Sequence, residues 1–181
     1  MPDSARLLLD QFLQPAQRAE AANRLVELGA LAVPAIASVL DGSARNPFGV
    51  ALRAASEEVA RCALVSARRL GRVAAPLEPL LRAELSSEFA GLRAEAAAAL
   101  GHLESISDET AAELAALLNS SPEVASEAAV ALVRLELLDH AAVRAAVGAF
   151  PLTRDYLVAA HRHIERRQAA IPCDCPTGNR S

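Results

Sequence analysis

The stretch that decides the fold is residues 18–36, which read RAEAANRLVELGALAVPAI. Its small and apolar residues recur at steps of three and four, the spacing of one helix face. Gly29 can take the left-handed conformation that ends a helix. Pro34 can begin the next helix, because its missing N–H would have no helical partner there in any case. The stretch therefore predicts a helix, a short turn and a second helix.

The same pattern returns further along the chain. A second segment ends its helix at Leu70-Gly71 and restarts at Pro76, which again follows the glycine by five residues. A third segment repeats the spacing with Arg93, Ala96, Ala97, Leu100 and Gly101, and restarts after Ser107. The return of one helix–turn–helix unit is the sequence signature of a repeat architecture.

A fourth segment, over 122–150, departs from the pattern at its turn. It keeps the small and apolar positions Ala128, Ala129 and Leu132. It has Leu135-Glu136 where the other segments have glycine. We expect Ser121 to cap its first helix and Asp139 its second, because short polar side chains accept hydrogen bonds from the free N–H groups of a helix start.

Composition predicts the same all-helical fold. The chain of 181 residues contains 42 Ala and 27 Leu, which together make up 38% of it. Both residues form helices readily because they lose little side-chain freedom there. The β-branched and aromatic side chains that cover a pleated sheet are scarce, with one Tyr, four Phe and no Trp. We therefore expect an all-α protein.

The pattern Arg-x-x-Ala-Ala-x-x-Leu, followed by glycine and a second helix, resembles HEAT repeats, in particular the short bacterial HEAT-like kind. The resemblance covers about residues 15–150 and is strongest in the first and third segments. It implies a short right-handed α-solenoid of about four helix–turn–helix repeats, with terminal capping helices over about 4–13 and 153–167. We expect a single domain over 1–171 and a flexible C-terminal tail over 172–181.

Several classes of function do not fit the composition. Lysine is absent, so Schiff-base chemistry and the lysine of a phosphate-binding P-loop are excluded. A net charge of −4 and few aromatic residues argue against a nucleic-acid partner. No apolar run is long enough to cross a bilayer, and the first residues lack the regions of a secretory signal. We expect a cytoplasmic protein that makes no contact with a membrane and needs no cofactor.

A helix expected over 52–70 carries a stripe of arginines opposite its apolar face. The stripe consists of Arg53, Arg61, Arg68 and Arg72, with Glu57 among them. The interpretation we favour is a solvated face with pairing across one helical turn at Glu57. The alternative is a docking site for a carboxylate-rich or phosphorylated partner. Cys62 lies on the apolar face and is expected to be buried.

Acidic residues dominate the next part of the chain. Residues 88–139 hold ten acidic side chains against Arg93 and Arg134, a net charge of −8. The candidate binding residues are Glu109, Glu113, Glu123 and Glu127, in two pairs spaced by one helical turn. Such a surface would attract a basic partner. Complementation of helix dipoles explains acids near helix starts equally well, and both interpretations stay open.

The C-terminus contains residue types that bind zinc. The candidates are His161, His163, Cys173 and Cys175. Helical residues two apart point in different directions, so the two histidines do not form a good pair. We expect His161 to pack against the apolar face of its helix, and the two cysteines to lie in a redox-sensitive tail. The sequence therefore predicts no metal site.

Three classes of function remain. The first, which we favour, is a non-catalytic protein-binding module that acts as an adaptor, a scaffold or an inhibitor. An immunity protein that neutralises a cationic toxin would be one example. The second is an enzyme, since HEAT-like relatives include DNA glycosylases, bilin lyases and a di-iron hydroxylase. The third is metal binding or redox sensing through the C-terminal histidines and cysteines. Fold alone decides none of them.

Overall fold

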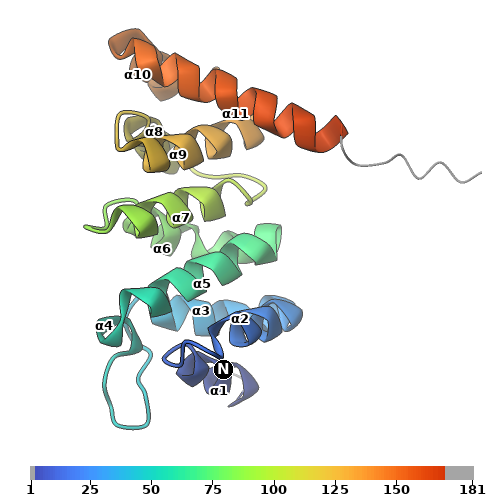
Figure 1. The fold of residues 1–181 in the computed structure, drawn as a ribbon, viewed down its shortest axis with the longest axis vertical. Helices are drawn as coiled ribbons and strands as arrows, with labels where there is room; N and C mark the ends of the chain where they lie inside the picture. Colours follow the sequence, from blue (N-terminus) through green and yellow to red (C-terminus); the bar gives the residue numbers. More distant parts are fainter. Residues whose placement is uncertain (1–2, 170–181) are drawn as a thin grey trace, which may run out of the picture.

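Helices follow one another in chain order along the longest axis of the molecule (Figure 1). The computed structural model describes residues 3–169. Within that range every regular element is a helix, which confirms the all-α prediction. None of these helices is both long enough and apolar enough to span a bilayer. The predicted tail over 172–181 lies outside the described residues.

The described elements are α1 (Asp3–Gln11), α2 (Arg18–Glu27), α3 (Val33–Leu40), α4 (Leu52–Ala55), α5 (Glu57–Leu70), α6 (Glu78–Glu84), α7 (Ala90–Leu100), α8 (Asp108–Leu117), α9 (Pro122–Arg134), α10 (Ala141–Ala149) and α11 (Pro151–Ala169). Two short 3-10 helices, η1 (Gly29–Ala32) and η2 (Gly71–Leu77), connect α2 to α3 and α5 to α6.

The helices form two layers. In the first layer, α2, α5, α7, α9 and α11 each pack against the next. The second layer contains α3, α6, α8 and α10, each packed beside a helix of the first layer. One continuous apolar core runs between the layers, from Leu9 and Phe12 near the N-terminus to Leu157 in α11. The order of the stack therefore follows the order of the sequence.

Two of the predicted glycine stops have the expected backbone. Gly29 and Gly71 have φ values of +56° and +57°, in the left-handed region that favours glycine. Gly101 does not, because its φ is −66°. A Cβ atom on Gly101 would lie 2.6 Å from the Cα atom of Ala131. This glycine is therefore required by the close approach of α7 and α9, rather than by its backbone conformation.

The fourth segment makes its turn without glycine. Glu136 has a φ of +58°, and it is the one non-glycine residue with positive φ in the described range. Its side chain is exposed, and its N–H donates to the carbonyl of Val133 at 3.1 Å. The turn that ends the helix therefore contains a residue with positive φ in this segment too, although glycine, the residue that adopts this conformation most easily, is absent.

The helix expected over 52–70 is broken at Ser56. This residue is extended, with φ −168° and ψ 136°, and its hydroxyl accepts a hydrogen bond from the N–H of Glu58 at 3.2 Å. Serine competes for backbone N–H groups and so favours a helix start over a helix interior. The prediction of one continuous helix was wrong, and Arg53 belongs to α4 rather than to α5.

Ser121 takes the predicted N-cap position, but neither Ser121 nor Asp139 makes the predicted capping hydrogen bond. Ser107 caps α8 by accepting from the N–H of Thr110 at 3.3 Å. Ser121 precedes α9 but makes no capping hydrogen bond through its side chain. The start of α10 is capped by His140, whose Nδ1 accepts from the N–H of Ala142 at 3.3 Å, and not by Asp139. Asp139 lies one residue too early to serve as the cap.

The two prolines that follow glycine by five residues differ in position. Pro34 lies in the first turn of α3, as predicted. Pro76 lies inside η2, and Pro79 occupies the first turn of α6 instead. The longer 3-10 helix delays the start of the second helix, and this explains the difference.

The arginines that open the repeat pattern have the same role in two segments. Arg18 donates from Nε to the carbonyl of Phe12 at 2.8 Å. Arg93 donates from Nη1 to the carbonyl of Ser87, also six residues earlier and at 2.8 Å. Each guanidinium thus ties the turn before a first-layer helix to that helix. Arg18 and Arg93, which occupy the same position of the sequence pattern, thus make equivalent hydrogen bonds.

Replacement of Gly101 by alanine is expected to destabilise the protein by about 1–3 kcal/mol, because the added Cβ forces α7 and α9 apart. Gly148→Ala is the matched control, since Gly148 is helical and a Cβ added there would meet no atom within 4 Å. The free energy of unfolding of the control is expected to rise by about 0.5–1 kcal/mol, because alanine has a higher helix propensity than glycine. Urea unfolding of the two variants measures both changes, and equal effects would contradict the close approach.

Replacement of Glu136 by glycine is expected to raise the free energy of unfolding by about 0.5–1 kcal/mol. Glycine removes the steric cost of the left-handed conformation, and the greater freedom of the unfolded chain offsets part of this gain. Glu136→Ala keeps the Cβ atom and should show no comparable gain. Thermal unfolding of the two variants side by side checks this, and a gain in the alanine variant would implicate the charge instead.

Candidate functional site

Arg53 is engaged in an ion pair that links α4 to α6. Its guanidinium pairs with Oε1 of Glu84 and donates to the carbonyl of Leu40 at 2.7 Å. Glu84 is only 3% exposed, and its second oxygen has no hydrogen-bond partner among the described residues. A buried carboxylate of this kind depends on its cationic partner. Arg53 thus has a structural role.

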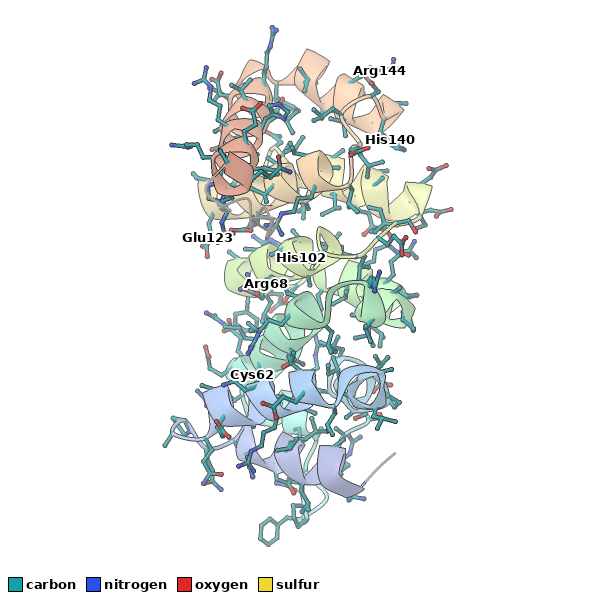
Figure 2. All side chains as sticks on the ribbon, turned by 90° about the vertical axis from the view of Figure 1, so that its right-hand side faces the viewer. Cys62, Arg68, His102, Glu123, His140 and Arg144 are labelled. Carbon is teal, nitrogen blue, oxygen red and sulfur yellow. The ribbon has the colours of Figure 1, made fainter. Side chains whose placement is uncertain are left out.

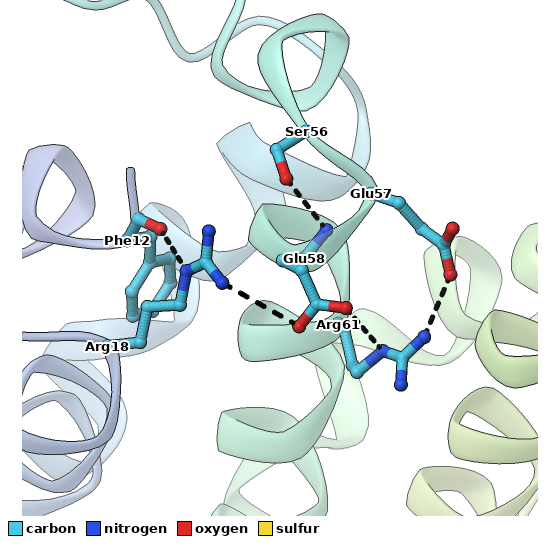
Figure 3. A network of polar contacts seen from close by, with 6 residues as sticks. All are labelled: Phe12, Arg18, Ser56, Glu57, Glu58 and Arg61. Atoms are coloured by element: carbon cyan, nitrogen blue, oxygen red, sulfur yellow. Dashed lines mark hydrogen bonds and ion pairs between the residues drawn. The ribbon is translucent and has the colours of Figure 1, made fainter. Parts of the chain in front are cut away.

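Arg61 belongs to a network that Figure 3 shows in detail. Its guanidinium lies 2.9 Å from Oε1 of Glu57 and 3.4 Å from Oε1 of Glu58. Glu58 also faces Arg18 of the neighbouring α2, at 4.0 Å. The hydrogen bond that Arg61 donates to Glu57 is the main reason that the pKa of Arg61 is raised. The pairing across one turn that the sequence predicts is present.

The two remaining arginines of the predicted stripe differ from each other. Arg68 pairs with Glu95 of α7 at 3.0 Å. Arg72 lies in η2, is exposed, and makes no ion pair within the described part of the chain. The four arginines thus lie on α4, α5 and η2 and have different partners. They do not form one continuous basic surface.

The four candidate acidic residues also separate. Glu109 and Glu123 are exposed in the first turns of α8 and α9. Glu113 lies 3.7 Å from Arg82. Glu127 is half-buried among basic side chains on α9. Because α8 and α9 are in different layers, these carboxylates do not gather into one patch.

The histidine candidates for a metal site point in different directions. His161 is exposed and lies 3.3 Å from Glu165, so the expectation that it packs against the core was wrong. His163 is also exposed and faces α9. Cys173 and Cys175 lie outside the described residues. Among residues 3–169, no group of three metal-ligating side chains comes together.

Cys62 is half-buried, rather than fully buried as expected. Burial of the thiol raises its pKa, an effect that the nearby Arg18 and Arg61 partly offset. The thiolate is the reactive form of cysteine, so a raised pKa makes this side chain less nucleophilic. In Figure 2, Cys62 lies below Arg68 and His102 in the stack.

A small cavity of about 260 Å³ opens between α5, α7, α9 and α11. Its polar lining is mostly basic and comes from Arg68, His102, Glu127, Arg134, His163 and Arg167. Its floor is made of small and apolar residues of α7 and α9, among them Gly101 and Ala131. We call this cavity the basic cleft. Figure 2 shows Arg68 and His102 close together on the side of the stack that faces the viewer.

Hydrogen bonds fix the state of His102 at the edge of the basic cleft. Its Nδ1 lies 2.9 Å from the carbonyl of Ala98, to which it donates. The Nη1 atom of Arg134 lies close to Nε2 and 3.0 Å from Nδ1, so the guanidinium rests against the imidazole ring. Burial lowers the pKa of the imidazole, and the cations Arg134 and Arg68 lower it further, against a smaller opposing effect from the Ala98 hydrogen bond and Glu127. These surroundings favour the neutral form of the His102 imidazole.

The basic cleft was not predicted from the sequence, although a signal was present. Arg68, His102, Arg134 and Arg167 follow each other at intervals of 34, 32 and 33 residues. These intervals are about one repeat, so each residue occupies the C-terminal end of a successive first-layer helix or the turn just after it. Stacking of the helices then brings the four side chains to one side of the protein.

A second, larger groove of about 550 Å³ lies between α10 and α11. Its apolar lining is Leu138, Val143, Val147, Leu157 and Val158. Arg144, Arg154 and Arg162 lie around it, together with the paired His161 and Glu165. We call it the terminal groove. It occupies a different face of α11 from the one that lines the basic cleft.

Comparison of the chain with protein families, curated proteins and solved structures finds no match. The geometry described above is therefore the basis for the functional inference.

Replacement of Arg134 by glutamine is expected to raise the pKa of His102, because the variant removes the nearest cation and loosens the cover over the imidazole. In the native protein, the imidazole of His102 is protonated at a higher pH in the unfolded chain than in the folded chain. The free energy of unfolding should therefore fall as the pH is lowered through about 6.5. Titration of the histidine ring protons by NMR measures the shift, with His140 and His161, which lie outside the basic cleft, as internal references. An unchanged or lowered pKa in the variant would contradict the assignment.

Proposed function

We propose that the chain is a non-catalytic protein–protein interaction module built as a short HEAT-like α-solenoid. The two helix layers that follow chain order support this architecture, as does the shared role of Arg18 and Arg93. Stacked helix pairs form extended surfaces that are free to vary while the core stays constant. Such surfaces suit the recognition of another protein.

The terminal groove is the observation that carries this proposal. Leu138 and Val158 are 39% and 41% exposed, and they border an apolar hollow at the end of the stack. Large apolar side chains left open to water in a defined groove mark a protein-binding surface. The groove between two helices has the form that accepts a third, amphipathic helix.

The charges around the terminal groove indicate the kind of partner. Arg144, Arg154 and Arg162 border it, and among the described lining residues only Glu165 opposes them, already paired with His161. An occupant with apolar residues on one face and carboxylates beside them would match both features. We propose an amphipathic helix of a partner protein with acidic flanks as the occupant.

A basic partner at the acidic residues remains the second proposal within the same function. Glu109 and Glu123 are exposed and make no ion pair among residues 3–169. Both carboxylates also lie in first turns, where they complement the helix dipole. Variants can test Glu109 and Glu123 separately from the terminal groove, because these residues lie on α8 and α9 and the groove lies between α10 and α11.

An affinity pull-down from the native host extract, with the bound proteins identified by mass spectrometry, tests which surface is used. The groove variant carries Leu138→Asp and Val158→Asp at two part-exposed positions, and the acidic variant carries Glu109→Arg and Glu123→Arg. We expect the groove variant to capture at least about tenfold less of the specific partner than the native chain, and the acidic variant to capture the same amount. The reverse result would favour a basic partner.

Size-exclusion chromatography of the same variants distinguishes the other possible occupants of the terminal groove. If the native chain is a dimer and the groove variant is a monomer, a second copy fills the groove, and the proposal of a different partner fails. Circular dichroism of both variants confirms that the helical fold is kept.

A further inference from the structure

We propose that the basic cleft is a binding site for a phosphate group. Three arginines and two histidines from four parts of the chain converge on a cavity of about 260 Å³, with Glu127 as the one acidic residue among the described residues of its lining. Guanidinium groups match the geometry and the charge of phosphate oxygens better than any other side chain. The inference is independent of the proposed protein-binding function, because the terminal groove lies on another face of α11.

The arrangement of charges in the basic cleft does not serve the fold alone. Arg68 has a carboxylate partner in Glu95. Arg134 and Arg167 make no ion pair within the described range, and the nearest group to Arg134 is the neutral imidazole of His102. Burial lowers the pKa of the Arg134 guanidinium, and the positive charges of Arg167 and Arg68 lower it further, while Glu127 offsets only part of this effect. The cations of the cleft therefore repel one another. A bound anion would remove that repulsion.

Helix dipoles explain one part of the pattern. Arg68, Arg134 and Arg167 lie in the last turns of α5, α9 and α11, where a cation is favourable. Dipole complementation is satisfied when each side chain stays near its own helix end. It does not require the three side chains to border one cavity.

The floor of the basic cleft leaves space for a ligand. Ala98, Gly101 and Ala131 present little or no side chain, and the cavity between the basic groups stays open above them. The guanidinium of Arg134 lies against the imidazole of His102 at the edge of this space. Hydrogen bonds between a charged donor and a charged acceptor are shorter and stronger than those between neutral groups. Arginines that border this space could each donate such hydrogen bonds to one phosphate group.

Titration of the purified chain with inorganic phosphate tests the site. Binding is followed by calorimetry and by the midpoint of thermal unfolding, against sodium chloride at equal ionic strength. The cleft variant carries Arg134→Gln and Arg167→Gln. The control variant carries Arg144→Gln and Arg162→Gln, which removes the same charge from the terminal groove. We expect the native chain and the control variant to bind phosphate equally, and the cleft variant to bind at least about tenfold more weakly.

Two results would overturn the proposal. The first is no difference between phosphate and chloride in the native chain, which would assign the arginines to helix dipoles alone. The second is equal phosphate binding by all three proteins. If the cleft variant does not fold, Arg167→Gln alone takes its place in the titration, since Arg167 is exposed near the end of α11. Parallel titrations with glycerol phosphate and with a phosphoserine peptide identify which phosphate ester binds more tightly, and binding of either supports the site.

Discussion

The close contact between α7 and α9 is the constraint on which the rest of the stack depends. Gly101 has no side chain because the backbone of Ala131 occupies the place that a Cβ would need. Along α7 itself, Ala96, Ala97 and Ala99 are fully buried, so small residues set the spacing toward neighbours on several sides. Gly101 and Ala131, the two residues at this contact, also line the basic cleft. One choice of residue size thus determines both the packing and the candidate site.

Local sequence was sufficient for the helices but not for every boundary between them. Gly29, Gly71 and Ser107 act through their own backbone or their nearest neighbours, so their roles could be predicted. Ser56 interrupts a stretch whose apolar spacing is continuous, and only the chain's path from α4 to α5 decides that it caps rather than continues a helix. The role of Gly101 depends on a residue thirty positions away in α9. Contacts of that range do not show in a local pattern.

The candidate sites were less predictable than the fold for the same reason. Each arginine of the basic cleft could be explained by the end of its own helix, and the stacking of four helices was needed to place them around one cavity. The acidic residues looked like one surface because they are close in sequence, whereas α8 and α9 place them in different layers. The terminal groove is open because no other helix among residues 3–169 fills the space between α10 and α11, and no residue of the groove indicates this by itself.

The order of contacts also has a mechanical consequence. Within residues 3–169, each first-layer helix packs mainly against the helices just before and just after it, and few contacts join distant parts of the chain. In such a stack, small changes of angle between successive helices would add up along its length. Such changes would alter the distance between the terminal groove and the N-terminal helices without breaking any single junction. A partner that contacts both ends would therefore bind a compliant body, whose two contact surfaces are not held at one fixed distance.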